Sequence, residues 1–163
     1  MTIDSLEDLF EHELEDVYYA ENQLLDVLEE LAEQTDSEEI TRAFEEHREQ
    51  TEQHVERVEE VFEMIGEPPE EEECEGINGL IQEHEEFVEM EPDQAVLDLY
   101  NLSAAEKTEH YEIAAYGNLA FLADQLGMDD AADLLGTNLD EEKQTLETLK
   151  DLTVDYEFEA IPA

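Results

Sequence analysis

The sequence predicts an all-α protein, a four-helix bundle with one long crossover that contains a short extra helix. The 163 residues include only 6 glycines and 4 prolines, which divide the chain into long segments. Apolar residues recur in those segments every three or four positions, as in amphipathic helices, and no strand pattern competes. The length suffices for one domain with a sizeable core. We therefore expect one bundle over residues 1–152 and a C-terminal tail over 153–163.

The first two predicted helices have nearly equal lengths. Asp4 or Ser5 is a suitable N-cap for the first helix, which continues to about Gln34. After the short connection TDS, the second helix runs from Glu38 to Ile65 and stops at the sequence GEPP. So short a connection makes the two helices antiparallel neighbours.

A longer connection separates these helices from the last two. We expect a loop over residues 67–79, followed by a short amphipathic helix with the sequence INGLIQEHEEFVEM. The third long helix should run from about Pro92 to a C-cap at Gly127. The fourth starts at MDDAADLL and continues, over an irregularity at Gly136, to about Leu152. The tail either folds back or stays loose. Short, long and short connections are the ferritin-like arrangement.

The charge of the chain restricts its surroundings and partners. The sequence holds 51 acidic and 6 basic residues, a formal net charge of -45. Such a surface repels itself in dilute salt but is screened at molar salt, where the Debye length is about 3 Å. We therefore expect a salt-rich cytoplasm, as in a salt-accumulating halophile. The lysines and arginines are scattered, so neither nucleic acid nor an anionic membrane is an expected partner.

Cysteine usage and the N-terminus also indicate a cytoplasmic protein. The single cysteine, Cys74, precludes an internal disulfide and lies in the acidic run EPPEEEECEG, where we expect an unreactive loop residue. The N-terminus lacks the pattern of a signal peptide, and no apolar run approaches the roughly 20 residues of a membrane span.

Three glutamates lie on apolar stripes that should face the core. They are Glu21 in the first helix, Glu109 in the third and Glu142 in the fourth. The interval from Glu21 to His54 is 33 residues, and so is the interval from Glu109 to Glu142. Two packed hairpins of equal span would bring these four side chains to one depth. Glu112, one turn after Glu109, can add a fifth ligand.

The chemistry that follows from this set is metal binding. A buried, unpaired carboxylate costs several kcal/mol, and three together repel one another. Two divalent cations would cancel that cost, and oxygen ligands with one or two histidines suit iron or manganese. We expect no organic cofactor. With so many acidic residues, glutamates also fall on stripes by chance, so a solvated face is the alternative for each.

The other histidines and the tyrosines receive lesser roles. We interpret His47 as a hydrogen-bonded neighbour of the site, or a core residue, in preference to a ligand, and leave His54 open between the two roles. We expect His110 at the rim, and His12 and His84 at the surface. A tyrosine such as Tyr116 could relay electrons near a metal, although aromatic residues at helical spacing usually belong to the core.

Nearly the whole chain resembles the YciE/YciF family of ferritin-like stress proteins, above all in EHYEIAAYG and AENQL. The resemblance implies a ferritin-like four-helix domain, a homodimer and a two-metal centre related to those of rubrerythrin, bacterioferritin and manganese catalase. The metal ligands that the resemblance implies are Glu21 in the first helix, Glu109 and Glu112 in the third, and Glu142 in the fourth.

The sequence departs from the ferritin pattern at several site positions. Ferritins carry E-x-x-H in the second helix, where this chain has His54 and then Arg57, and Thr145 replaces a histidine of the fourth helix. Gln50 stands where relatives carry a carboxylate, although it should still lie beside the site. We expect a metal-binding stress protein with peroxide- or oxygen-linked redox chemistry. The alternative is a dimeric interaction protein with a degenerate site, and catalysis is left open.

Overall fold

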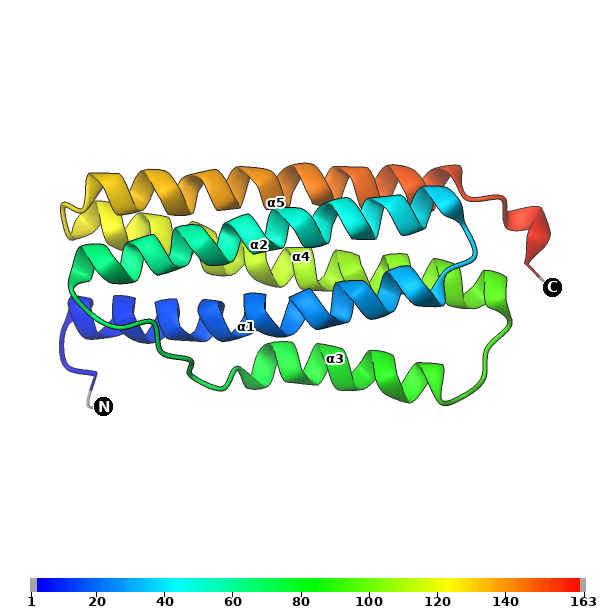
Figure 1. The fold of residues 1–163 in the computed structure, drawn as a ribbon, viewed down its shortest axis with the longest axis horizontal. Coiled ribbons are helices and arrows are strands. Elements are labelled where there is room, and N and C mark those ends of the chain that lie inside the picture. Colours follow the sequence, from blue (N-terminus) through cyan, green and yellow to red (C-terminus); the bar gives the residue numbers. More distant parts are fainter. Residues whose placement is uncertain (1–2, 162–163) are drawn as a thin grey trace.

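The computed structural model describes residues 3–161 and is all-α, as the sequence predicts (Figure 1). In this part of the chain the regular structure consists of five α-helices and one short 3₁₀ helix. Their bounds are α1 Leu6–Gln34, α2 Glu38–Ile65, α3 Glu75–Val88, α4 Gln94–Gln125, α5 Asp129–Asp155 and η1 Phe158–Ala160.

The four long helices lie side by side as two antiparallel hairpins (Figure 1). Helices α1 and α2 form one hairpin, α4 and α5 form the other, and the hairpins meet where α1 contacts α4 and α2 contacts α5. The crossover between the hairpins runs the length of the bundle and carries α3 along its outside, against α4. This confirms the predicted four-helix bundle with one crossover.

Local sequence explains where the helices begin and end. Ser5 starts α1 with a capping box, in which its hydroxyl accepts a hydrogen bond from the Asp8 N–H at 3.0 Å. Gly66 ends α2 in the left-handed conformation, with φ of 79°. Asp93 caps α4, so Pro92 precedes the helix and is not its first residue. Helix α5 continues through Gly136 without the expected irregularity.

The expected loop over residues 67–79 is wrong at its end, because α3 begins at Glu75. Cys74 is its N-cap and is buried, with its sulfur 3.4 Å from the Ile77 N–H and 2.9 Å from the Tyr111 hydroxyl. His84 is also buried and not at the surface. Its Nε2 lies within hydrogen-bond distance, 2.7 Å, of Asn101 Oδ1 where α3 meets α4. His12 is half-buried.

Tyr156, the first residue after α5, contacts the bundle, whereas Glu157, Phe158 and Glu159 are exposed, so the course of the tail stays a prediction. Helix α5 extends to Asp155, and the Tyr156 hydroxyl then lies 3.5 Å from the carboxyl group of Asp98 in α4. Asp98 is itself buried and accepts a 2.8 Å hydrogen bond from Thr35 in the α1–α2 connection. One buried carboxyl group therefore joins three parts of the chain at this end.

Two apolar clusters fill the bundle on either side of a polar middle. One contains Phe10 and Leu14 of α1 with Phe62 of α2, and the other contains Leu31 of α1 with Phe44 of α2. On each long helix, the fully buried glutamates and histidines lie between these two apolar clusters. None of the helices in residues 3–161 is long and apolar enough to cross a membrane.

Candidate metal centre

Six buried polar side chains from all four long helices meet in the middle of the bundle. Five of them are fully buried, and the sixth, His47, is 5% exposed. We call them the histidine–glutamate cluster. Its members are Glu21 of α1, His47 and His54 of α2, Glu109 and Glu112 of α4, and Glu142 of α5.

The cluster forms two groups that share one residue. In each group, every residue has a potential ligand atom within 4.8 Å of the potential ligand atoms of the others. Glu142 belongs to both groups and therefore lies between them. The first group is His47, Glu109, Glu112 and Glu142, and the second is Glu21, His54 and Glu142.

Each histidine lies against glutamates of the cluster. His47 Nε2 is 2.7 Å from Glu109 Oε1. His54 Nδ1 is 2.9 Å from Glu142 Oε1 and 3.3 Å from Glu21 Oε1. None of these three contacts has the alignment of a hydrogen bond, so the side chains face a common space without bonding one another.

Outside the cluster, a second set of contacts fixes the His54 ring. Its Nε2 lies 2.9 Å from Glu141 Oε2, and Arg57 donates to the same oxygen at 2.6 Å. Arg57 also donates to Asn138 at 2.8 Å, and the Asn138 amide donates to the backbone carbonyl of His54 at 3.3 Å. With Nε2 turned to Glu141, Nδ1 is the nitrogen that faces the cluster.

The cluster holds protons when it holds no metal. Burial, followed by the negative charge of Glu142, raises the pKa of Glu109 well above its usual range. Burial raises the pKa of Glu112 in the same way. These two side chains therefore keep their protons to a higher pH than ordinary glutamates do.

His54 and Glu142 behave in the opposite way, as a charged pair. Burial lowers the pKa of His54, but contacts with Glu142 and Glu21 outweigh it and raise the value to about 10. Burial likewise raises the pKa of Glu142, while His54 and Glu109 lower it to about 2. For His47, burial outweighs the charges of Glu142 and Glu21 and lowers the pKa.

The donor set could hold a metal ion. Both oxygens of Glu109, Glu112 and Glu142 are buried without a hydrogen-bond donor, and so is Oε2 of Glu21. Buried polar groups almost always have partners, and ionised ones are paired or coordinate metals. Carboxylate oxygens with two imidazoles are ligands of iron and manganese in bundle cores. The protons of Glu109, Glu112 and His54 would have to leave when a metal ion binds.

The sequence-based candidates divide into those that the bundle brings together and those that it does not. Glu21, His54, Glu109, Glu112 and Glu142 all lie in the cluster, and their role as ligands stays a prediction. His47 lies there too, although we interpreted it as a neighbour or a core residue. The sequence indicates this position of His47, because it lies seven residues before His54, about two helical turns along the same face.

The remaining candidates lie around the cluster or outside it. The Tyr116 hydroxyl donates to Glu21, which makes it a direct neighbour. Gln50 accepts a 2.9 Å hydrogen bond from Thr145 across the α2–α5 contact. His110 is exposed and does not lie beside the cluster. Glu141, which contacts His54, was missed because a half-exposed glutamate on an acidic helix has no distinguishing pattern.

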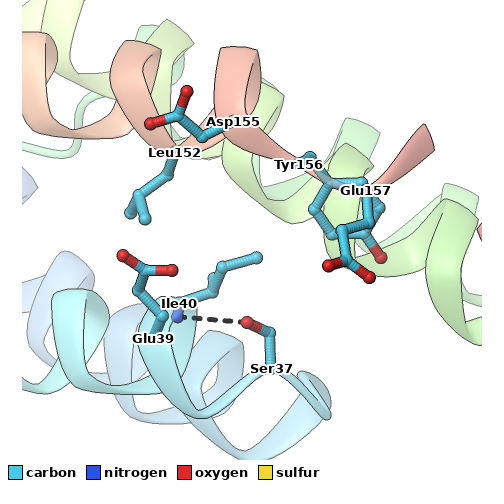
Figure 2. Close-up of a pocket in the computed structure, with 7 residues that line it drawn as sticks. All are labelled: Ser37, Glu39, Ile40, Leu152, Asp155, Tyr156 and Glu157. Atoms are coloured by element: carbon cyan, nitrogen blue, oxygen red, sulfur yellow. Dashed lines mark hydrogen bonds between the residues drawn. The ribbon is translucent and has the colours of Figure 1, made fainter.

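Another hollow lies apart from the cluster, between the start of α2 and the end of α5 (Figure 2). Its volume is about 340 Å³. Figure 2 shows Leu152 of α5 pointing toward α2, where Glu39 and Ile40 lie, with Asp155, Tyr156 and Glu157 at the end of α5 and just beyond it. None of its lining residues belongs to the histidine–glutamate cluster, so we do not associate it with the metal centre.

Comparison with known proteins gives the family of the chain. A family model described as a domain of unknown function, DUF892, matches residues 5–157. The chain belongs to the DUF892 family. A curated relative in this comparison is Protein YciF of Escherichia coli strain K12, 42% identical over 155 residues, with 94% of this chain and 93% of YciF covered.

Solved structures show the same bundle. The crystal structure of the E. coli stress protein YciF matches with a TM-score of 0.90 and 41% identity, over 94% of this chain and 98% of that one. YcfI from Rhodopseudomonas palustris matches with a TM-score of 0.88 and 39% identity, over 91% and 94%. A protein from Xanthomonas campestris, with a TM-score of 0.73 and 21% identity over 91% and 90%, shares the fold. The family part of the resemblance is thus confirmed.

Proposed function

We propose that this DUF892 protein is a metal-binding member of the ferritin-like superfamily, with two iron or manganese ions held by the histidine–glutamate cluster. The relationship to a stress protein supports a role under stress. The observation that carries the proposal is the burial of seven carboxyl oxygens without hydrogen-bond donors at one depth of the bundle. A cation pair is the simplest compensation for such a group.

The residues would divide the work between two ions. His47, Glu109, Glu112 and Glu142 would hold one ion, and Glu21, His54 and Glu142 would hold the other. Bound iron or manganese would supply one-electron chemistry with oxygen or peroxide. The protein would orient His54 through Glu141 and exclude bulk water, since five of the six side chains have no exposure.

Tyr116 is the residue placed to take part beside the ions. It is fully buried, its hydroxyl donates to Glu21, and burial and the charge of Glu21 raise its pKa well above its usual range. It therefore keeps its proton and holds the Glu21 oxygen in place. We propose this holding role for it.

The second candidate is a non-catalytic interaction protein, homodimeric like the family that it resembles. The observation in its favour is the Gln50–Thr145 hydrogen bond, because Thr145 replaces a histidine of ferritins and Gln50 stands where relatives carry a carboxylate. Such a protein would keep the bundle without binding metal. Metal binding therefore decides between the two functions.

The test is a titration of chelator-treated, untagged protein with Mn(II) or anaerobic Fe(II) at high salt. We expect saturation near two ions per chain, as the two groups imply, and a rise in melting temperature because only the folded chain presents the site. ICP-MS of the purified protein should show near-stoichiometric iron or manganese. Background metal content, no saturation and an unchanged melting temperature would favour the interaction protein.

We also propose that the protein works in a salt-rich environment. The formal net charge of -45 supports this, because repulsion among surface carboxylates is long-ranged when the Debye length reaches about 30 Å at 0.01 M salt. We expect dialysis from molar to millimolar KCl to reduce the helical CD signal or the melting temperature. Equal melting curves at both salt concentrations would contradict the proposal.

A further inference from the structure

The histidine–glutamate cluster reaches the molecular surface at one of its members. His47 is 5% exposed, whereas the other five residues are fully buried. The same side chain forms part of the wall of a hollow of about 190 Å³ between α2 and α5. We call this hollow the α2–α5 pocket. Its lining residues are Ala43, Glu46, His47, Gln50, Gln144, Thr145, Thr148 and Leu149.

Four other hollows do not connect to the cluster in this way. They lie at the ends of the bundle, along α1 and α2, and between α1, α3 and α4, and none of the six cluster residues lines them. The remaining stretch of the α2–α5 contact is closed beside His54, where Arg57 pairs with Glu141 at 2.6 Å. Of these five hollows, the α2–α5 pocket adjoins the cluster, through His47.

His47 links the pocket to the interior. Its Nε2 lies 2.7 Å from Glu109 Oε1 inside the cluster, while its Nδ1 is buried and has no hydrogen-bond partner. One imidazole thus spans the distance from the pocket wall to the first group of potential ligands. An unpartnered nitrogen on a side chain this well buried needs a compensating contact.

The pocket is lined with oxygen atoms suited to a cation that sheds its water. Glu46 offers an exposed carboxylate, and Gln144 and Thr148 are exposed as well. Deeper in, the hydrogen bond from Thr145 to Gln50 crosses from α5 to α2 at 2.9 Å, and both residues are half-buried. Hard cations exchange water for such neutral and carboxylate oxygens, and the acidic surface concentrates cations near it.

We propose that the α2–α5 pocket is the entrance through which a divalent cation reaches the histidine–glutamate cluster, and that the Thr145–Gln50 hydrogen bond is its constriction. The ion passes the side chains of Glu46, Gln50 and Thr145 before it meets His47. This inference rests on the proposed metal-binding function, but it concerns the rate of entry and not the affinity of the site.

The test compares Mn(II) uptake by variants of the full chain, followed by the loss of the EPR signal of free Mn(II) after rapid mixing. Thr148→Phe fills part of the pocket, and we expect it to slow uptake by about tenfold or more while equilibrium affinity stays unchanged. Its matched control is Thr137→Phe. Thr137 is also exposed on α5 and bonds the carbonyl four residues earlier, as Thr148 does, but does not line the pocket.

A second variant tests the constriction independently. Thr145→Ala removes the hydrogen bond to Gln50 and adds no bulk to the α2–α5 pocket. We therefore expect faster Mn(II) uptake at unchanged affinity. If CD shows that Thr148→Phe does not fold, Thr145→Ala decides alone, and an uptake rate equal to that of the wild type overturns the proposal. An equal rate in folded Thr148→Phe also overturns it.

The two proposals fail in different ways. Wild-type protein that binds Mn(II) while Thr148→Phe loads normally refutes the entrance and leaves the metal-binding function standing. Wild-type protein that binds no Mn(II) refutes both. A loss of equilibrium affinity in Thr148→Phe, with CD unchanged, would assign the residue to the site itself and likewise overturn the entrance.

Discussion

Replacing Glu142 by Gln should destabilise the metal-free protein and abolish the binding of both metal ions. Glu142 is ionised in the bundle, since His54 outweighs burial and lowers its pKa to about 2. Removing one partner of a buried ion pair costs about 3–5 kcal/mol, because the other charge is left uncompensated. Glu142 is also shared by both groups of potential ligands, so neither group is complete without it.

Replacing Glu109 by Gln should have a different pair of effects. Burial, followed by the charge of Glu142, raises the pKa of Glu109, so its side chain keeps its proton to a higher pH than an ordinary glutamate does. An amide of the same size should therefore change the free energy of unfolding by less than about 1 kcal/mol. Glu109 belongs to one group only, so we expect metal content to fall from two ions to one.

Two variants outside the histidine–glutamate cluster serve as controls for Glu142→Gln and Glu109→Gln. Glu106→Gln lies one turn before Glu109, at a half-buried position that accepts a 2.8 Å hydrogen bond from Thr153. Glu147→Gln lies on α5 at an exposed position 3.2 Å from Lys150. Urea unfolding at high salt and ICP-MS of reloaded protein would measure stability and metal content. Full metal content in Glu142→Gln, or its loss in Glu106→Gln, would refute the ligand assignment.

The sequence predicts most of the cluster because its geometry follows from helical periodicity and equal spans. Glu21 and His54 are separated by the same number of residues as Glu109 and Glu142, and each hairpin turns tightly. The two turns lie at opposite ends of the bundle, so these positions reach one depth because each lies about half a helix length from its turn (Figure 1). The apolar neighbours on each helix then indicate which face points inward.

Other parts of the structure depend on packing between helices that are distant in sequence. The periodicity of apolar residues within one helix does not predict that packing. Cys74 lies in an acidic run typical of a loop, yet it is buried because α3 packs its first turn against α1 and α4. His84 is buried for the same reason. The pairing of His54 with Glu141, and of Arg57 with Glu141, joins α2 to α5 and has no signature in either helix alone.

The metal-free protein should lose stability as the pH rises from about 7 toward 10. The folded-state pKa of His54 is about 10, above the ordinary value of 6.5. A raised pKa stabilises the folded state fully below the unfolded value, and that stability is lost as the pH rises through the folded value. Glu109 and Glu112 also have raised pKa values, so their contributions change in the same direction. At about 1.4 kcal/mol per pKa unit, the loss should be a few kcal/mol.

The acid side should show the opposite dependence, because Glu142 has a lowered pKa. Its contribution is complete above the ordinary value of 4.5 and is lost as the pH falls toward about 2. Glu109 and Glu112, whose pKa values are raised from 4.5, begin to lose their contribution above that value, so metal-free stability should be greatest near about pH 4.5. The charged pair of His54 and Glu142 is intact there, and Glu109 is still neutral.

Urea unfolding of chelator-treated protein at several pH values, in constant molar KCl, would measure this profile. His54→Gln is the matched variant, since it lacks the titrating imidazole, and its stability should change less between about pH 7 and pH 10. Metal-loaded protein should follow the reverse trend over the same range. Metal ions displace the protons of His54, Glu109 and Glu112, so binding becomes tighter as the proton concentration falls. Metal-free wild-type stability that stays constant or rises with pH, and matches that of His54→Gln, would refute the charged pair.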